Sequence, residues 1–241
     1  MDRMIYNAMA GAKAAMQRQE VLSNNLANVS TTGFRAEMVA FRSVPVQGDG
    51  ASTRAYALET TVGYNDQAGP WNHTERRLDV AMVGKAWMAV QALDGTEAYT
   101  RAGSLDVNAE GLLVTKGGLP VLGDGGPITV PPNSTVQIGG DGTVSAKGQT
   151  GRPNTVGRIK LVTPEAPLQR GEDSLFRGAD GDLQADPLAK LESGVLEGSN
   201  VSAVETMVAM ISAARQFEQQ MKLLTLAQTQ GQVSSKLLSP T

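Results

Sequence analysis

The sequence predicts an α+β fold in which a helix at each end of the chain brackets a β-rich middle. The first observation concerns proline: none of the 11 prolines lies before Pro45, and only Pro240 lies after Pro187. The second concerns glycine, because fourteen of the 27 glycines fall between Gly95 and Gly157. Helix interiors exclude both residue types, whereas turn-rich β structure uses them. The chain is therefore expected to run from helix to β structure and back to helix.

The N-terminal helix is predicted from the spacing of its apolar residues. Steps of three and four residues, with one longer step, connect Ile5, Met9, Ala12, Met16 and Leu26. A second row flanks this stripe at seven-residue steps and contains Ala8, Ala15, Leu22 and Val29. Such spacing is typical of an amphipathic helix, and alanine adds helix propensity. The helix is expected to fade by Asn28 and to be ended by Thr32-Gly33, and residues 1–31 are assigned to an N-terminal helical domain.

The C-terminal segment repeats this pattern. Steps of three and four residues connect Val204, Met207, Ile211, Ala214, Phe217, Met221 and Leu224. Ser202 and Glu205 have the spacing of a capping box at the start of the helix. The helix is expected to run to about Leu237, a length of roughly 50 Å at about 1.5 Å per residue. Residues 196–241 are therefore assigned to a C-terminal helical domain.

The two helices are expected to pair as an α-helical coiled coil. Each has one apolar face, and about 170 residues separate them in the sequence. The simplest geometry places them side by side, with the middle of the chain inserted as a separate β-rich domain over residues 71–195. Residues 42–70 are polar and lack periodicity, so they are predicted to be an extended arm or loop within a linker that spans 32–70.

The middle of the chain is predicted to contain several β-hairpins. The turn Asp94-Gly95 separates a strand over Ala86–Leu93 from one over Thr96–Arg101. Two further hairpins turn at residues 108–111 and 139–142, with strands at 105–107, 112–115, 135–138 and 143–145. A later strand is expected at Arg158–Val162.

Composition excludes several classes of site. The 241 residues carry a net charge of −3 with scattered lysine and arginine, which argues against nucleic-acid binding. Cysteine is absent and His73 is the single histidine, so thiolate sites and sites with two imidazoles are excluded. No catalytic residue, cofactor or metal is expected.

No apolar run approaches the roughly 18 residues that span a bilayer, and the N-terminus lacks the apolar segment of a usual signal peptide. Composition alone would suggest a cytoplasmic protein without direct membrane insertion.

Individual polar residues have simpler explanations than catalysis or metal binding. His73 is expected to be a polar surface residue, and Asp180, Asp182 and Asp186 a solvated turn, because their spacing does not match a calcium loop. The amides of Asn24, Asn25 and Asn28 either mark a fraying helix end or fix the register between subunits.

Large apolar and acidic side chains in the middle of the chain leave two further questions. Trp87 is expected in the core because it lies in an apolar strand, whereas Trp71 follows Gly69-Pro70 and could be exposed at a subunit contact. A carboxylate pair for glycan hydrolysis could come from Glu165, Glu172 and Asp173. These three acids lie in a polar stretch with no other sign of a pocket.

Several segments resemble one family in the order in which that family has them. They are Ser23–Arg35, Leu78–Gly84, Asp94–Ser104, Gly111–Gly118 and Leu196–Glu205. Together they resemble the flagellar axial proteins of the rod and hook. The opening Met1–Tyr6 and the segment Trp87–Gln91 resemble the proximal-rod member, although Met88 stands where an aromatic residue would be expected. A distal-rod homologue is the alternative within the family.

The resemblance implies a structural subunit of the flagellar basal-body rod and not an enzyme. It implies export through the flagellar export apparatus without a cleaved signal, and assembly in the periplasm. The implied partners are copies of the same chain and other proteins of the proximal and distal rod. The two alternatives outside the family are a coiled-coil stalk that presents a β domain to a glycan or other ligand, and an enzyme acting on the cell wall.

The helical stripes are the predicted assembly contacts. The residues are Ile5, Met9, Met16, Leu22, Leu26, Val204, Met207, Ile211, Phe217, Met221 and Leu224. Ordering about 30 residues costs roughly 1–2 kcal/mol each, whereas full burial of a large apolar side chain returns about 1.5–3 kcal/mol. A lone helix pair leaves much of each stripe in water, so the ends are expected to fold on assembly. Head-to-tail contacts that do not close would then build a filament that transmits torque.

Overall fold

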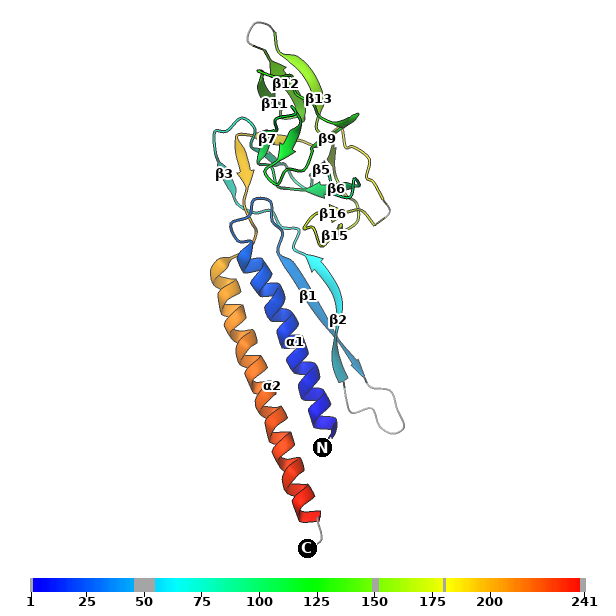
Figure 1. Ribbon diagram of the computed structural model, residues 1–241, viewed down its shortest axis with the longest axis vertical. Coiled ribbons are helices and arrows are strands. Elements are labelled where there is room, and N and C mark those ends of the chain that lie inside the picture. The colour runs from blue at the N-terminus through cyan, green and yellow to red at the C-terminus, as the bar shows by residue number, and fades with distance from the viewer. Residues whose placement is uncertain (1, 46–54, 149–151, 180, 239–241) are drawn as a thin grey trace. The chain divides into compact units, whose positions relative to one another are not determined.

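The computed structural model describes residues 2–45, 55–148, 152–179 and 181–238. Two helices and a β-rich middle confirm the predicted α+β class (Figure 1). The chain divides into two compact units, each built from segments that are distant in sequence. The helical unit contains Met1–Val29, Ala36–Asn65 and Val201–Thr241. The β unit contains Ser30–Arg35 and Asp66–Asn200.

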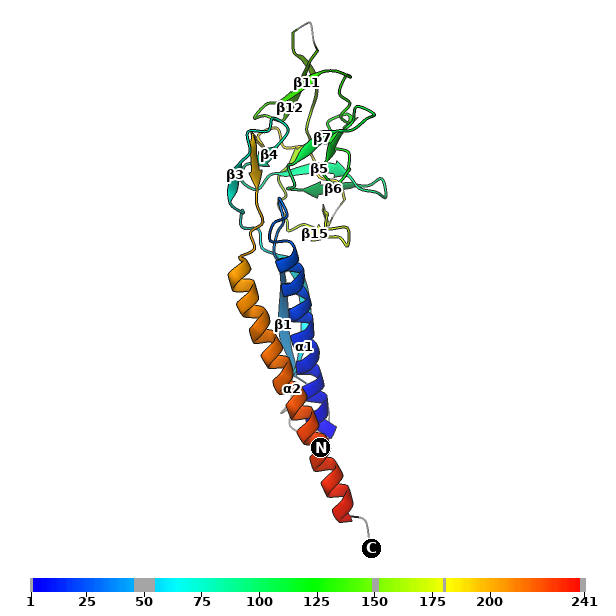
Figure 2. The ribbon, with the colours of Figure 1, turned by 60° about the vertical axis from the view of Figure 1, so that its left-hand side comes forward.

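The helical unit is built on two long antiparallel helices. Helix α1 covers Asp2–Ala27 and helix α2 covers Ala203–Leu238, and they lie side by side in both views (Figure 1 and Figure 2). The predicted start of α2 is confirmed, because the Glu205 N–H donates to Ser202 Oγ at 3.4 Å. Among the described residues, neither helix is long and apolar enough to cross a membrane.

A β-hairpin completes the helical unit. Strand β1 (Glu37–Pro45) pairs antiparallel with β2 (Ala55–Tyr64), and both strands contact α1. The prediction of an arm or loop over 42–70 is therefore wrong for the parts that fall in these strands, and residues 46–54 lie outside the described residues. A β-bulge between Ala40 and Phe41 shifts the register. Because a bulge interrupts the two-residue alternation of a strand, the sequence pattern gives little sign of this hairpin.

The β unit is assembled from short antiparallel strands. Its largest sheet has the order β14-β5-β6-β16-β15. The bounds in this sheet are Leu161–Val162 for β14, Trp87–Gln91 for β5, Glu97–Thr100 for β6, Phe176–Arg177 for β16 and Gln169–Arg170 for β15. A second sheet contains β11 (Thr135–Ile138), β12 (Thr143–Lys147) and β13 (Asn154–Arg158).

Four strand pairs complete the β unit. The first two pairs are β17 (Leu191–Ser193) with β4 (Val80–Met82), and β18 (Val195–Glu197) with β3 (Trp71–His73). The other two are β7 (Leu105–Val107) with β8 (Leu113–Thr115), and β9 (Leu122–Gly123) with β10 (Gly126–Pro127).

The three predicted hairpins in the middle of the chain are confirmed as β5–β6, β7–β8 and β11–β12. Two other expectations need correction. The single strand expected at Arg158–Val162 is split between β13 and β14, because the Ile159 N–H donates to Gly142 and the Lys160 N–H to Leu122 as the chain changes sheets. The segment assigned to the C-terminal helical domain from residue 196 begins with the end of β18, and α2 starts at Ala203.

The core of the β unit is mainly aliphatic. Its fully buried side chains include Met88, Leu105 and Leu113. Trp87 is also fully buried, and its ring lies 4.6 Å from that of Phe176 between centroids, which confirms the prediction that it belongs to the core. The unit can thus hold its fold through its own interior packing.

Candidate assembly surface

Small side chains are buried on both helices of the helical unit, in which α1 packs against α2 and the β1–β2 hairpin. Ala8, Ala12 and Ala15 are buried on α1, and Ala213 and Ala227 are buried on α2. The α1 positions are separated by four and three residues, and the α2 positions by fourteen, as expected for side chains on one helical face. Alanine allows the helices to approach closely but buries little apolar area for each residue.

The large apolar side chains at the start of α2 lie on another face. Val204, Met207, Val208 and Ile211 are between 50% and 73% exposed. Their spacing of i, i+3, i+4 and i+7 places them together on one side of the helix. At about 100° per residue, this side is opposite the buried Ala213. We call these four residues the α2 patch.

Helix α1 also carries large apolar side chains outside the helix contact. Tyr6, Met9 and Met16 are between 49% and 61% exposed. Ala12, which the sequence pattern placed on the same stripe as both methionines, is instead buried. The stripe therefore divides into a small buried face and a large exposed one.

The eleven predicted contact residues are all on α1 or α2, and none of them is fully buried. Six are exposed: Met9, Met16, Val204, Met207, Ile211 and Met221. Five are half-buried: Ile5, Leu22, Leu26, Phe217 and Leu224. Exposed apolar residues of the helices that the stripes did not include are Tyr6, Val208, Leu223, Leu226 and Val233. Helix α2 has apolar residues on two opposite sides, and this pattern in the sequence could have identified Val208.

The asparagines near the end of α1 have partners within the chain. The Asn25 side chain is buried, donates to the Glu37 carbonyl at 2.9 Å and accepts from the Glu37 N–H at 2.8 Å. Asn25 thereby fixes the start of β1 to α1, a role that neither of the two predictions anticipated. The Asn28 side chain donates to the carbonyl and side-chain oxygens of Asn24 at 2.9 and 3.0 Å.

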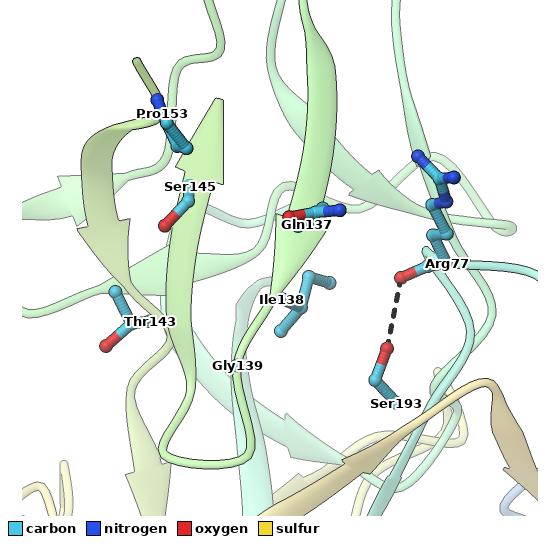
Figure 3. A pocket seen from close by; sticks show the side chains of 8 residues that line it. All are labelled: Arg77, Gln137, Ile138, Gly139, Thr143, Ser145, Pro153 and Ser193. Carbon is cyan, nitrogen blue, oxygen red and sulfur yellow. Dashed lines mark hydrogen bonds between the residues drawn. The ribbon is translucent and has the colours of Figure 1, made fainter. Parts of the chain in front are cut away.

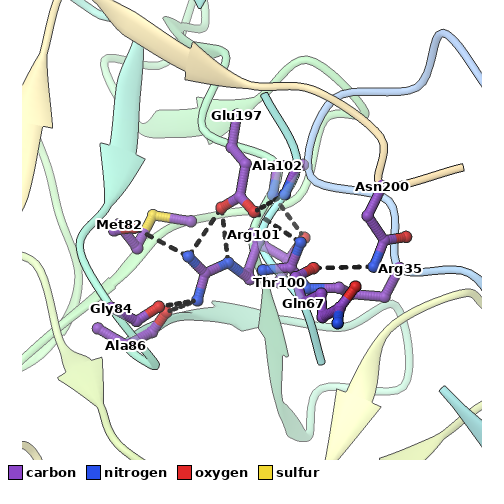
Figure 4. A network of polar contacts seen from close by, with 11 residues as sticks. Arg35, Gln67, Met82, Gly84, Ala86, Thr100, Arg101, Ala102, Glu197 and Asn200 are labelled. Carbon is purple, nitrogen blue, oxygen red and sulfur yellow. Dashed lines mark hydrogen bonds and ion pairs between the residues drawn. The ribbon is translucent and has the colours of Figure 1, made fainter. Parts of the chain in front are cut away.

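A buried ionic network holds three distant segments of the β unit together (Figure 4). Glu197, at the end of β18, is fully buried, and its Oε2 accepts from Arg101 Nε and lies by Arg101 Nη2, both at 2.7 Å. Its Oε1 accepts from the Gly69 N–H at 3.0 Å and lies 2.6 Å from Arg35 Nη1. Burial lowers the pKa of Arg101 from its ordinary value, and Glu197 opposes that shift.

A hollow of about 450 Å³ lies beside the β11–β12 hairpin (Figure 3). It is lined by Arg77, Gln137, Ile138, Gly139, Thr143, Ser145, Pro153 and Ser193. These residues include no carboxylate, so the hollow does not offer the pair of acids that glycan hydrolysis requires. Elsewhere, the Asp173 carboxylate accepts from Arg177 at 2.7 and 3.1 Å, and this hydrogen bonding lowers the pKa of Asp173. A carboxyl group held ionised in this way is a poor general acid.

The remaining candidate residues do not form a site among the described residues. His73 is exposed on β3, and Trp71 is exposed at its start. Over the described ranges no cluster of three histidine or acidic side chains could hold a metal ion. Asp180, from the acidic turn considered above, lies outside the described residues.

Comparison with protein families places both ends and the middle of the chain. The profile described as "Flagella basal body rod protein" matches residues 5–35. The profile "Flagellar hook protein FlgE/F/G D1 domain" matches residues 81–146, and "Flagellar basal body rod FlgEFG protein C-terminal" matches residues 192–237.

Full-length relatives decide the family. The chain is 46% identical to the flagellar basal-body rod protein FlgF of Salmonella typhimurium over 99% of both chains. It is 44% identical to Escherichia coli FlgF, also over 99% of both. This chain belongs to the FlgF family of flagellar basal-body rod proteins. It is 33% identical to the rod protein FlgG of Caulobacter vibrioides over 96% of this chain and 98% of that protein. The FlgF-like chain is thus a structural subunit of the flagellar basal-body rod.

The ionic network was not predicted, although the motifs contain all its members. Arg35, Arg101 and Glu197 each fall in a different one of the three matched segments. Arg35 is the only charged residue in Ser23–Arg35. A lone charge in an otherwise neutral segment is a signal that could have directed attention to it.

Proposed function

We propose that this rod subunit assembles through the exposed apolar faces of α1 and α2, which neighbouring rod subunits cover. The observation that carries the proposal is the α2 patch, where four large apolar side chains share one side of a helix and remain in water. A patch with this spacing is typical of a helix that docks into a groove or against another helix. The partners would be copies of this chain and other proteins of the rod.

The packing of the helical unit supports a coiled-coil pairing of α1 and α2. The least exposed side chains of α2 include Thr206, Ala213 and Ala227, which fall on one seven-residue repeat. Gln220 continues the repeat, and its side chain lies against Gly11 of α1. Because these inner positions are small or polar, the pair alone buries little apolar area.

Because the helix pair alone buries little apolar area, its exposed faces gain stability when neighbouring subunits cover them. A large side chain that a neighbour covers fully contributes about 1.5–3 kcal/mol, reduced by the part already buried. The helices therefore gain stability with each neighbour, and the ends of the chain become ordered as the rod assembles. Close-packed helices in a continuous tube resist shear, which would allow the rod to transmit torque. The carboxylate of Asp173 is engaged by Arg177, and the hollow beside β11–β12 is lined by no acid, so neither favours the glycan-hydrolase alternative.

The substitution Ile211→Asp tests the assembly surface. It places a charge in the α2 patch, where burial by a neighbour would leave that charge desolvated and unpaired. We expect incorporation into purified basal bodies to be abolished, while the blue-shifted emission of buried Trp87 shows that the β unit remains folded.

The matched control is Ser212→Asp, which adds the same charge at an exposed polar position on a different side of α2. Incorporation of the control should be near normal. Normal incorporation of Ile211→Asp would remove the α2 patch from the assembly surface, and equal loss in both variants would indicate a general sensitivity of the helix to charge.

A further inference from the structure

The ionic network of the β unit contains one more cation than anion. Arg35 and Arg101 are each 1% exposed and share the single carboxylate of Glu197. Asp66 also attracts Arg101, but its carboxylate is 45% exposed and lies 3.9 Å from Lys85. A surplus positive charge therefore remains in the interior, where an uncompensated charge is costly.

The half of the network formed by Arg101 and Glu197 is complete in itself. Besides its contacts with Glu197, Arg101 donates to the carbonyls of Ala86, Met82 and Gly84 at 2.8, 2.9 and 3.0 Å. All three of its guanidinium nitrogens therefore have acceptors. Glu197 would keep Arg101 on one oxygen and the Gly69 N–H on the other if Arg35 were absent.

The half formed by Arg35 is less well satisfied. Its Nη1 lies 2.6 Å from Glu197 Oε1, yet neither this nitrogen nor Nε makes an aligned hydrogen bond within the described residues. Arg35 and Glu197 therefore attract each other as opposite charges, but the hydrogen-bond geometry between them is poor. Proximity to Arg35 also lowers the pKa of Arg101, as expected for two like charges. The surplus charge is therefore best assigned to Arg35.

Backbone hydrogen bonds and the packing of Phe34 also hold the segment that carries Arg35. This segment, residues 30–35, joins α1 to β1 along the chain. The Gly33 N–H donates to the Glu197 carbonyl at 2.8 Å, and the Asn200 N–H donates to the Phe34 carbonyl at 3.3 Å. The Phe34 ring is buried, with the Arg170 guanidinium carbon 4.8 Å from its centroid.

We propose that residues 30–35 form a releasable strap on the β unit, and that the surplus charge of Arg35 sets how readily the strap opens. Docking the strap desolvates a guanidinium that the complete Arg101–Glu197 pair does not need. Opening returns this charge to water and leaves the pair intact. Arg35 is thus a positioning residue: its charge allows the strap between α1 and β1 to detach while the rest of the β unit stays folded.

Native-state hydrogen exchange of the full chain tests the strap. The Gly33 amide reports docking, and the Leu113 amide, which donates to Ile128 at 2.9 Å, reports the core. In the natural protein we expect Gly33 to exchange through an opening that leaves Leu113 protected. Arg35→Met removes the surplus charge but keeps an apolar chain, so we expect Gly33 exchange to slow by about tenfold, as when a costly buried charge is replaced.

Two further variants separate charge from general structure. Arg35→Lys keeps the surplus charge, so Gly33 should exchange at least as fast as in the natural protein. Arg152→Met removes a positive charge from an exposed position and should leave Gly33 exchange unchanged. Unchanged or faster Gly33 exchange in Arg35→Met, or exchange of Gly33 together with Leu113 in the natural protein, would overturn the proposal.

Discussion

The helical unit and the β unit use their apolar residues in opposite ways. In the β unit, large side chains such as Met88, Leu105 and Leu113 are fully buried. In the helical unit, alanines occupy the helix contact, while residues such as Met207 and Ile211 remain exposed. Since burial of large apolar groups is the main favourable term in folding, we expect the β unit to be stable by itself and the helical unit to depend on the neighbours that we propose cover it.

The largest effect expected from this difference is a gain of helix on assembly. Helices α1 and α2 contain 26 and 36 residues, yet a lone pair offers little burial to offset the cost of ordering them. We expect circular dichroism of the purified monomer at 222 nm to show much less helix than these lengths require, and the assembled rod to show the full amount. A monomer with both helices fully formed would contradict dependence on neighbours.

A pair of leucine truncations compares the two units directly. Leu105→Ala leaves a cavity in the core of the β unit and should lower its free energy of unfolding by about 2–5 kcal/mol. Leu224→Ala trims a half-buried side chain of α2 and should change stability in the monomer by less than about 1 kcal/mol. Urea unfolding followed by tryptophan emission, which reports on the β unit, gives the first value, and unfolding followed by circular dichroism at 222 nm, which reports on the helices, gives the second. Equal losses would show that the units fold as one.

The smallest effect concerns the close approach of the helices at Gly11. A Cβ at this position would lie 2.9 Å from the end of the flexible Gln220 side chain, which can move aside. Alanine is a better helix former than glycine by about 1 kcal/mol, so Gly11→Ala should raise the monomer's signal at 222 nm. The reverse change at the neighbouring turn, Ala14→Gly, should lower it. A decrease with Gly11→Ala would mean that Gln220 cannot yield.

Local signals predicted most of the regular structure. Asp94-Gly95 and residues 139–142 are turn sequences between apolar strands, and both hairpins are present because the information lies within a few neighbouring residues. The capping pair of Ser202 and Glu205 marks the start of α2 for the same reason. Where the chain departs from regular alternation, as at the bulge beside Phe41, the pattern was not sufficient.

Long-range relations could not be predicted from spacing. The apolar spacing placed Met9 and Ala12 on one stripe, but the elements that pack on α1, namely α2 and the β1–β2 hairpin, decide which of them is buried. The network of Arg35, Arg101 and Glu197 likewise depends on folding that unites distant positions. Its members were present in recognisable motifs, but a motif names residues without saying which of them meet.

Because Glu197 lies late in the chain, the β unit of a truncated chain would lack the anion of its ionic network. Arg101 precedes its carboxylate partner by 96 residues. A polypeptide that stopped before β18 would have two guanidinium groups to bury and no anion to receive them, a state that costs several kcal/mol per ion. Closure of the β unit over both guanidinium groups therefore requires β18, so fragments that end before β18 are disfavoured.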